Sequence, residues 1–415
     1  PDPIDPTDPS VPSYATDVGI TPGTPFWNNA DLWIRNQDDG EANPSAHQNP
    51  RSDVENYIYA RVQNFGNVRR AEIVQVSFYL ANYTGTEFIF PDDYTNLITA
   101  PDTPCPTLFC LDKGASSIAK VHLRPAQIPP TTWHPCLLVH VSCAQDQLVP
   151  AGSHVWDSNN LAQKNLVVDY VAQSQTLSLS VMAQNASSQQ PFFEFKGERV
   201  PEAAKLDLQF RDPDLIPEVI EPRVVTRVKR WGRLLLPVPL NRSVKFKLPI
   251  RLRTRKTIGL SFTAPPDARV GDEYQFELIQ SNEHRELTGG ITFVMRVVTP
   301  PSALKEQRRR SRVLREVGRR TGNDGFSSLA DAAEALIESH LTEAGEAPAD
   351  PSAARRRFSQ LLREIARPEV WGYPVEGLAD VSAKMQNQPG LATDLDALSL
   401  LLFHAQERLL VDEER

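Results

Sequence analysis

The first regularity along the chain is an alternation of apolar and polar residues, with a period of two, through much of residues 26–300. In AEIVQVSFYLA, for example, an apolar residue recurs at every second position: Val74, Val76, Phe78 and Leu80. Successive side chains of a β-strand point to opposite faces of a sheet, so this pattern predicts half-buried strands. From residue 301 onward the period becomes that of an amphipathic helix, as in the stripe Phe358, Leu361, Leu362 and Ile365.

These periods predict three folded parts after a linker. Short strands at 30–35, 56–64, 71–81 and 136–143, separated by Gly, Pro and Asn turns, predict an antiparallel sandwich over residues 25–171. Residues 172–300 repeat this logic and predict a second sandwich. Residues 301–415 predict an all-α bundle of three to five helices, with an Arg-rich helix at 302–320 and a helix capped by Asp350 that begins at Pro351.

Composition supports this mainly β architecture. The 415 residues include 35 prolines, which are excluded from helix interiors and central strands and therefore imply many turns and edges. Residues 1–24 are rich in Pro and Asp, which predicts an extended linker. We expect residue 1 not to be the natural start. No apolar run reaches the roughly 20 residues of a membrane-spanning helix.

A family resemblance rests on three stretches of the first part: DLWIR, NYIYARVQNFGNVRRAEIVQVSFYL and DSNNLAQKN. Over residues 26–170 they resemble the immunoglobulin-like domains of the CARDB type, found in bacterial surface and secreted proteins. The long insertion PDDYTNLITAPDTPCPTLFCLDKG departs from that pattern. The stretch IGLSFTAPPDARVGDEYQFELIQ resembles the end of many bacterial immunoglobulin-like domains. The resemblance implies two immunoglobulin-like sandwiches, binding or spacing rather than catalysis, and a secreted or cell-surface location in preference to the cytoplasm.

Candidate chemistry is sparse. The chain has no G-x-S-x-G, phosphate-loop, H-E-x-x-H, G-x-G-x-x-G or C-x-x-C motif, so we predict a protein that is not an enzyme and needs no cofactor. His134, Cys136 and His140 would share a strand face, but Cys136 and His140 lie about 13 Å apart along a strand, too far for one metal. The acidic stretch 38–53 matches no calcium-loop spacing and is interpreted as a solvated loop.

Four cysteines leave the redox compartment open: Cys105, Cys110, Cys136 and Cys143. On a continuous strand Cys136 and Cys143 are separated by about 23 Å and cannot form a disulfide. Any disulfide would therefore join Cys105 to Cys110, or either of them to the 136–143 strand.

The most unusual stretch is VKFKLPIRLRTRK, residues 244–256. A single strand here would bury Val244, Phe246, Leu248, Ile250 and Leu252, and would expose Lys245, Lys247, Arg251, Arg253 and Arg255. Pro249 lacks an N–H, which predicts an edge strand or a bulge. The preceding RVVTRVKR adds Arg223, Arg227 and Lys229 to the same cationic face. We predict that these eight residues bind an anionic partner.

Three explanations of the cationic face remain open. The first is a solvated edge that blocks sheet-to-sheet aggregation, with pairing within the chain, for which the acidic first part offers carboxylates. The others are a partner protein, or an anionic glycan or nucleic acid. Nucleic acid is disfavoured because no aromatic residue alternates with the basic positions. We interpret the chain as a structural or interaction protein of a larger bacterial assembly or multidomain chain, and oligomers fit that role. The alternative is an adaptor or substrate component of an enzyme system whose catalytic part lies elsewhere.

Overall fold

A computed structural model describes residues 17–414, except 24, 45, 67–69, 99–106, 130–133, 187–189, 199, 202, 222–227, 231–232, 239–242, 342–350 and 374. Side chains of residues 107–109, 198, 228–230, 376 and 412–413 are also left out. The chain forms two compact units. Unit 1 comprises Pro1–Val168 and Gly289–Thr292, and unit 2 comprises Asp169–Thr288 and Phe293–Arg415.

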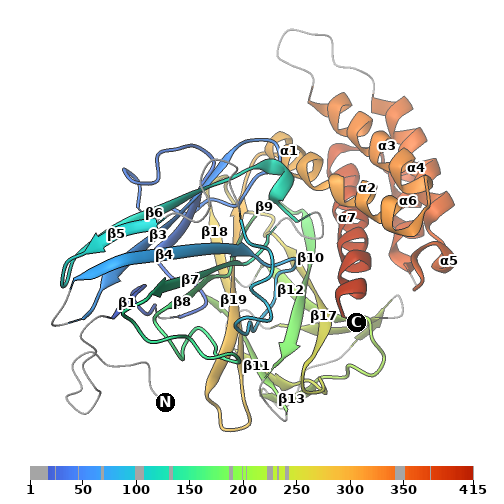
Figure 1. Ribbon diagram of the computed structural model, residues 1–415. Coiled ribbons are helices and arrows are strands. Elements are labelled where there is room, and N and C mark those ends of the chain that lie inside the picture. The colour runs from blue at the N-terminus through green and yellow to red at the C-terminus, as the bar shows by residue number, and fades with distance from the viewer. Residues whose placement is uncertain are drawn as a thin grey trace. The chain divides into compact units, whose positions relative to one another are not determined.

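Unit 1 is an antiparallel β-sandwich (Figure 1). In one sheet, β3 (Asn56–Asn64) pairs with β1 (Val18–Gly19), β2 (Leu32–Arg35) and β6 (Ser116–Leu123). The other sheet has the order β5 (Thr107–Leu111), β4 (Ala71–Leu80), β7 (Leu137–Cys143) and β8 (Leu161–Lys164). A short 3-10 helix, η1, spans Pro125–Gln127. The predicted alternation in β4 is confirmed, because Val74, Val76, Phe78 and Leu80 are all buried in a core shared by both sheets.

Unit 2 contains a second antiparallel sandwich. Its five-stranded sheet has the order β10 (Thr176–Asn185), β17 (Thr254–Thr263), β12 (Lys205–Phe210), β15 (Arg233–Pro237) and β14 (Val228–Arg230). The six-stranded sheet has the order β13 (Glu218–Glu221), β16 (Val244–Lys247), β11 (Phe192–Glu198), β18 (Glu273–Ser281), β19 (Leu287–Val297) and β9 (Leu166–Val171). Aromatic rings join the sheets, as between Phe262 on β17 and Phe276 on β18, whose centroids are 5.1 Å apart.

The rest of unit 2 is helical from Pro300, where the change of period predicts the switch. Thr299 caps the first helix by accepting a hydrogen bond from the backbone N–H of Ser302. The described part has seven helices, not three to five: α1 (Pro300–Arg310), α2 (Arg312–Thr321), α3 (Gly325–His340), α4 (Pro351–Ile365), α5 (Pro368–Trp371), α6 (Glu376–Asn387) and α7 (Leu391–Glu413). The fold class, two β-sandwiches followed by an all-α part, is confirmed.

Part of the difference in helix count arises because the 302–320 stretch is two helices, and the short α5 and the helix α6 add to it. The 302–320 stretch breaks at Ser311, whose hydroxyl donates to the carbonyl oxygen of Arg308 at 2.7 Å and so competes with the helical hydrogen bonds. Helix α4 begins at Pro351 as predicted, while its predicted cap, Asp350, lies outside the described residues.

Helix α7 covers the free edge of the five-stranded sheet at β10 (Figure 1). Backbone N–H groups at alternate β10 positions donate to α7 side chains: Ser178 to Oγ of Ser399 at 3.2 Å, and Ser180 to Oε1 of Gln406 at 3.0 Å. An exposed edge would leave these donors available to another strand. The helices and the second sandwich are therefore grouped in one compact unit, and a separate domain at 301–415 stays a prediction.

Candidate binding face of the second sandwich

The VKFKLPIRLRTRK stretch is not one strand. β16 ends at Lys247, and β17 begins at Thr254 in the opposite sheet of the sandwich. Val244, Phe246, Leu248 and Ile250 are buried as predicted, but the prediction for Leu252 is wrong, since its side chain is 53% exposed.

The physical reason is a turn between the two strands. Pro249 follows the end of β16 and has no N–H to donate to a neighbouring strand. The backbone N–H of Thr254 then donates to the carbonyl oxygen of Arg251 at 3.1 Å, and Arg253 takes a left-handed conformation with φ 61°. Of the two alternatives predicted from Pro249, an edge strand or a bulge, the edge position is wrong, because β16 lies between β13 and β11 inside its sheet. Pro249 itself lies beyond the end of β16.

The turn divides the predicted cationic face. Lys245 and Lys247 remain on β16, Arg251 and Arg253 are exposed in the turn, and Arg255 lies on β17, where its Nε donates to Oε1 of Gln184 at 3.2 Å. Arg223 and Arg227 lie outside the described residues, and Lys229 lies in β14 with a side chain outside them. The prediction of one continuous cationic face from Lys245 to Arg255 is therefore wrong.

Carboxylates of the same sheet face the two lysines of β16. Lys245 stands opposite Glu221 of β13 and Glu194 of β11, and its Nζ pairs with Oε2 of Glu221 at 3.1 Å. Lys247 stands opposite Glu218 of β13 and Phe192 of β11, and its Nζ lies 4.9 Å from the Phe192 ring centroid. Sequence reasoning missed these partners because strand register brings together residues more than 20 positions apart.

A pocket of about 390 Å³ opens on this outer face of the six-stranded sheet. Its apolar wall combines Ile220, Ile279 and Leu287, of which Leu287 is 49% exposed. Ile220 lines the pocket at an irregularity in the β13–β16 register, which shifts between Val219 and Glu221. We call this the sheet-face pocket: Phe192, Phe193, Glu194, Ile220, Glu221, Lys245, Ile279, Ser281, Arg285 and Leu287.

Two charged groups of the sheet-face pocket have no counter-ion among the described residues: the carboxylate of Glu194 and the guanidinium of Arg285. Arg285 lies in a tight turn, with φ 67°, and its guanidinium carbon is 4.0 Å from the Phe192 ring centroid. That distance is a cation–π contact. The pocket thus joins an apolar wall to one negative and one positive group that have no ion-pair partner within the described ranges.

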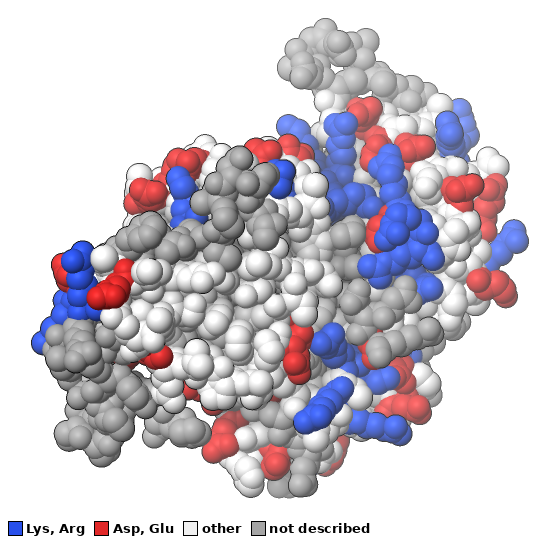
Figure 2. Space-filling view, in the orientation of Figure 1, with Lys and Arg blue, Asp and Glu red and all other residues white. Residues whose placement is uncertain are grey.

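Several arginines of the first two helices pair with carboxylates of the helical part, whereas the buried Arg310 of α1 pairs with Asp169 of β9. Arg315 contacts Asp331 at 2.8 Å and Glu334 at 2.6 Å, and Arg319 contacts Glu316 at 2.6 Å. Figure 2 correspondingly shows basic and acidic side chains interspersed on the visible surface. Together with the buried Arg310–Asp169 pair, these contacts supply carboxylates of the chain itself to much of the Arg-rich stretch.

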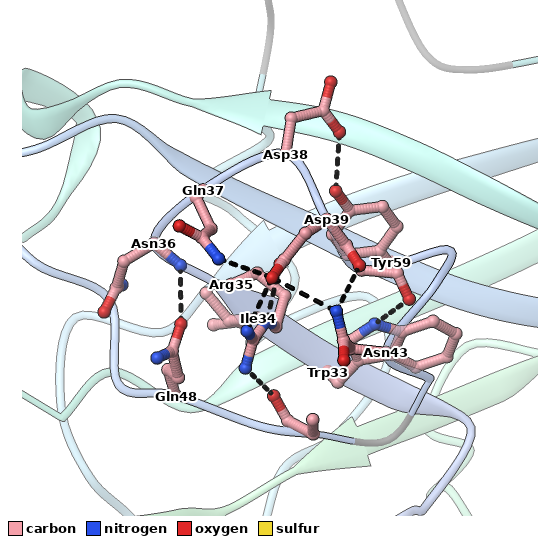
Figure 3. A network of polar contacts seen from close by, with 12 residues as sticks. Trp33, Ile34, Arg35, Asn36, Gln37, Asp38, Asp39, Asn43, Gln48 and Tyr59 are labelled. Atoms are coloured by element: carbon pink, nitrogen blue, oxygen red, sulfur yellow. Dashed lines mark hydrogen bonds and ion pairs between the residues drawn. The ribbon is translucent and has the colours of Figure 1, made fainter.

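The acidic loop at 38–53 is held by donors of the protein (Figure 3). Asp39 accepts hydrogen bonds from Nε of Arg35 at 2.7 Å and from Nδ2 of Asn43 at 3.2 Å. The hydrogen bond from Arg35 lowers the pKa of Asp39 to about 2. Asp38 accepts from the Tyr59 hydroxyl at 2.7 Å and pairs with Lys120. These contacts favour a structural role for the loop over calcium binding.

The remaining candidate chemistry forms no metal site among the residues described. No group of three His, Cys, Asp or Glu side chains there is arranged to hold an ion. Cys110, Cys136 and Cys143 are free thiols, and Cys105 lies outside the description. None of the helices in the described ranges combines the length and the apolar composition that a membrane-spanning helix requires.

Comparisons with known proteins add little. No family model and no curated protein matches the chain, so the CARDB-type resemblance stays a prediction.

Several solved structures show a weak likeness to the chain, and three of them serve as examples. The N-terminal domain of PorA has a TM-score of 0.20 and 13% identity, over 34% of this chain and 92% of that one. The CupB6 tip adhesin from Pseudomonas aeruginosa has a TM-score of 0.16 and 7% identity, over 69% and 99%. The collagen adhesin CNA from S. aureus has a TM-score of 0.16 and 6% identity, over 66% and 93%. Scores this low carry no argument about function.

Proposed function

We propose that this chain is a non-catalytic interaction protein that binds a protein partner through the outer face of the six-stranded sheet in unit 2. One observation carries the proposal: the sheet-face pocket combines exposed apolar surface with two charged groups for which the described residues provide no counter-ion. Binding sites in proteins are typically concave and mostly apolar, with a few polar groups that orient the ligand. The predicted anionic partner is thereby replaced with a partner of mixed charge.

The contacts of Lys245 and Lys247 within the sheet support a partner of mixed charge over an anionic one. Each lysine already has a neighbour within the sheet, Glu221 for Lys245 and the Phe192 ring for Lys247. A polyanion would have to displace these contacts and approach Glu194 and Glu221. Heparin retention that survives physiological salt and is lost in Lys245→Gln would favour the anionic-glycan alternative instead.

The test is a selection from a displayed random-peptide library on the immobilised full chain. A parallel selection uses Leu287→Asp, which places a charge in the apolar wall, and a matched control uses Val270→Asp, at a residue 66% exposed in the β17–β18 connection. We expect one peptide consensus with the native chain and with Val270→Asp, and its loss with Leu287→Asp. Equal enrichment on all three chains, or none on any, would remove the proposal.

A further inference from the structure

The spacing of charges in the sheet-face pocket specifies what kind of segment fits it. This step rests on the proposed function and adds a ligand class to it. We propose that the pocket binds an extended partner segment whose lysine or arginine pairs with Glu194, and whose Asp or Glu, two residues away, pairs with Arg285.

Of the two charged groups proposed for recognition, Glu194 is less exposed than Arg285. It lies on β11, and its cross-strand neighbours are Ile279 of β18 and Lys245 of β16. The Lys245 ammonium is directed to Glu221, so Glu194 stands beside apolar surface and forms no ion pair with any residue in the described part of the chain. A carboxylate in such surroundings gains from a hydrogen-bonded cation more than a fully hydrated one does.

A lysine or arginine side chain would match both the apolar wall of the pocket and the negative charge of Glu194. Its aliphatic stem can cover Ile220, Ile279 and Leu287 while the cationic end reaches Glu194. A volume of about 390 Å³ is in the range of pockets that hold a small ligand or a few side chains.

Arg285 supplies the second contact. Its guanidinium stacks on Phe192, which precedes Glu194 by two positions on the same face of β11. Side chains two apart on a strand are separated by roughly 6.5 Å. An extended ligand presents its own side chains at that same interval, so a basic residue on Glu194 places the residue two positions away near Arg285. The complementary pattern is a basic residue, any residue, then an acidic residue, in either chain direction.

The experiment measures binding of the full chain to capped, fluorescently labelled peptides by anisotropy. The host peptide is Thr-Val-Lys-Thr-Glu-Val-Thr, and the comparison peptides carry norleucine for Lys, Gln for Glu, or one extra Thr between Lys and Glu. Each of the three changes should weaken binding roughly tenfold, as loss of one charged contact predicts.

Two variants of the chain assign the contacts. Glu194→Gln should abolish the preference for Lys over norleucine, and Arg285→Asn, which tolerates the left-handed backbone, should abolish the preference for Glu over Gln. Asp267→Asn, an exposed carboxylate elsewhere on the sandwich, is the matched control and should change neither preference. Circular dichroism confirms that all variants are folded.

The outcomes separate the two proposals. If the peptides bind in a Leu287-dependent way but norleucine and Gln peptides bind as tightly as the host, the charge assignment is overturned and the binding face remains. If the host peptide does not bind at about 1 mM, the weak end of specific association, this inference falls. The library selection then decides separately whether the face binds any other peptide.

Discussion

Arg233 on β15 donates from Nη1 to Oε1 of Glu407 on α7 at 2.8 Å, and both side chains are buried. Arg211 lies 3.7 Å from the same carboxylate, and the ring of His404 is within the same group of buried side chains. The ion pair joins a sheet strand to the last helix. Removing one member of such a pair leaves an uncompensated buried charge, which makes the contact a sensitive point of unit 2.

Glu407→Gln should therefore lower the free energy of unfolding of unit 2 by about 3–5 kcal/mol, because Arg233 would stay buried without its carboxylate. Chemical denaturation followed by circular dichroism measures the change. Glu369→Gln, at an exposed position of α5, is the control and should stay within about 0.5 kcal/mol of the native chain. An equally small effect of Glu407→Gln would contradict the prediction.

The ion pair between Arg233 and Glu407 also makes the stability of unit 2 depend on pH in the acid range. Burial raises the pKa of Glu407, but the charge and hydrogen bond of Arg233 outweigh it and hold that pKa well below its usual value. The stabilisation is therefore present above the pKa of the unfolded chain, about 4.3, and is lost as the pH falls below it. The stability of unit 2 should fall on acidification below about pH 4.3, and more steeply in the native chain than in Glu407→Gln.

His154 makes the stability of unit 1 depend on pH with the opposite sign. Burial lowers its pKa, but Asp157 and Glu87, whose Oε1 lies 3.0 Å from Nε2, raise the pKa to about 9. The stabilisation is complete below about pH 6.5, the value for an unfolded chain, and is lost as the pH rises through 9. Unit 1 should lose up to about 3 kcal/mol across that window.

Hydrogen exchange of the β4 and β7 amides between pH 6 and 9.5, corrected for intrinsic exchange, follows this loss. His154→Gln should flatten the dependence, and His284→Gln, 74% exposed in unit 2, should leave it unchanged. A dependence of the same steepness in His154→Gln would assign it to another group.

Leu401, fully buried on α7, tests whether residues 301–415 form a domain of their own. Because α7 covers the edge of β10, we expect Leu401→Asp to destabilise the helices and the second sandwich together by several kcal/mol, as a buried carboxylate does. Thermal melts read at helical and β-sheet wavelengths should then coincide for unit 2. Early loss of the helical signal with the sheet signal retained would instead support the independent bundle that the periodicity predicts.

Lys245 and Arg251 separate a paired charge from an exposed one. Lys245→Glu would place a third carboxylate in a row with Glu194 and Glu221, which should cost about 1 kcal/mol or more. Arg251→Glu, in the exposed turn, should cost less than about 0.5 kcal/mol. Urea denaturation at low and high salt measures both, and salt should reduce the difference because it screens like charges. Equal costs at low salt would argue against the cross-strand pairing.

The local sequence pattern alone predicted those strands and helices in which apolar side chains recur with a clear period. The alternation of Val74, Val76, Phe78 and Leu80 predicted a strand with that face buried, and the change of period at Pro300 predicted where the helices begin. Both follow from short-range geometry, since neighbouring residues are enough to define a period of 2 or 3.6. For the same reason Val244 and Phe246 of β16 were correctly predicted to be buried, and the burial of Leu248 and Ile250 was also predicted although they lie beyond the end of that strand.

Only the tertiary structure decided which strands are neighbours, and with that which side chains line the face proposed for binding. The turn at Arg251–Thr254 sends Arg255 into the opposite sheet, while β13 and β11 bring Glu221 and Glu194 beside Lys245. The cover that α7 provides for β10 is likewise invisible in a helical period, which shows that a helix has an apolar face but not what that face meets. Register and sheet order depend on contacts between residues distant in the chain. Each cross-strand pair contributes only a few tenths to about 1 kcal/mol, so no short stretch of sequence specifies them.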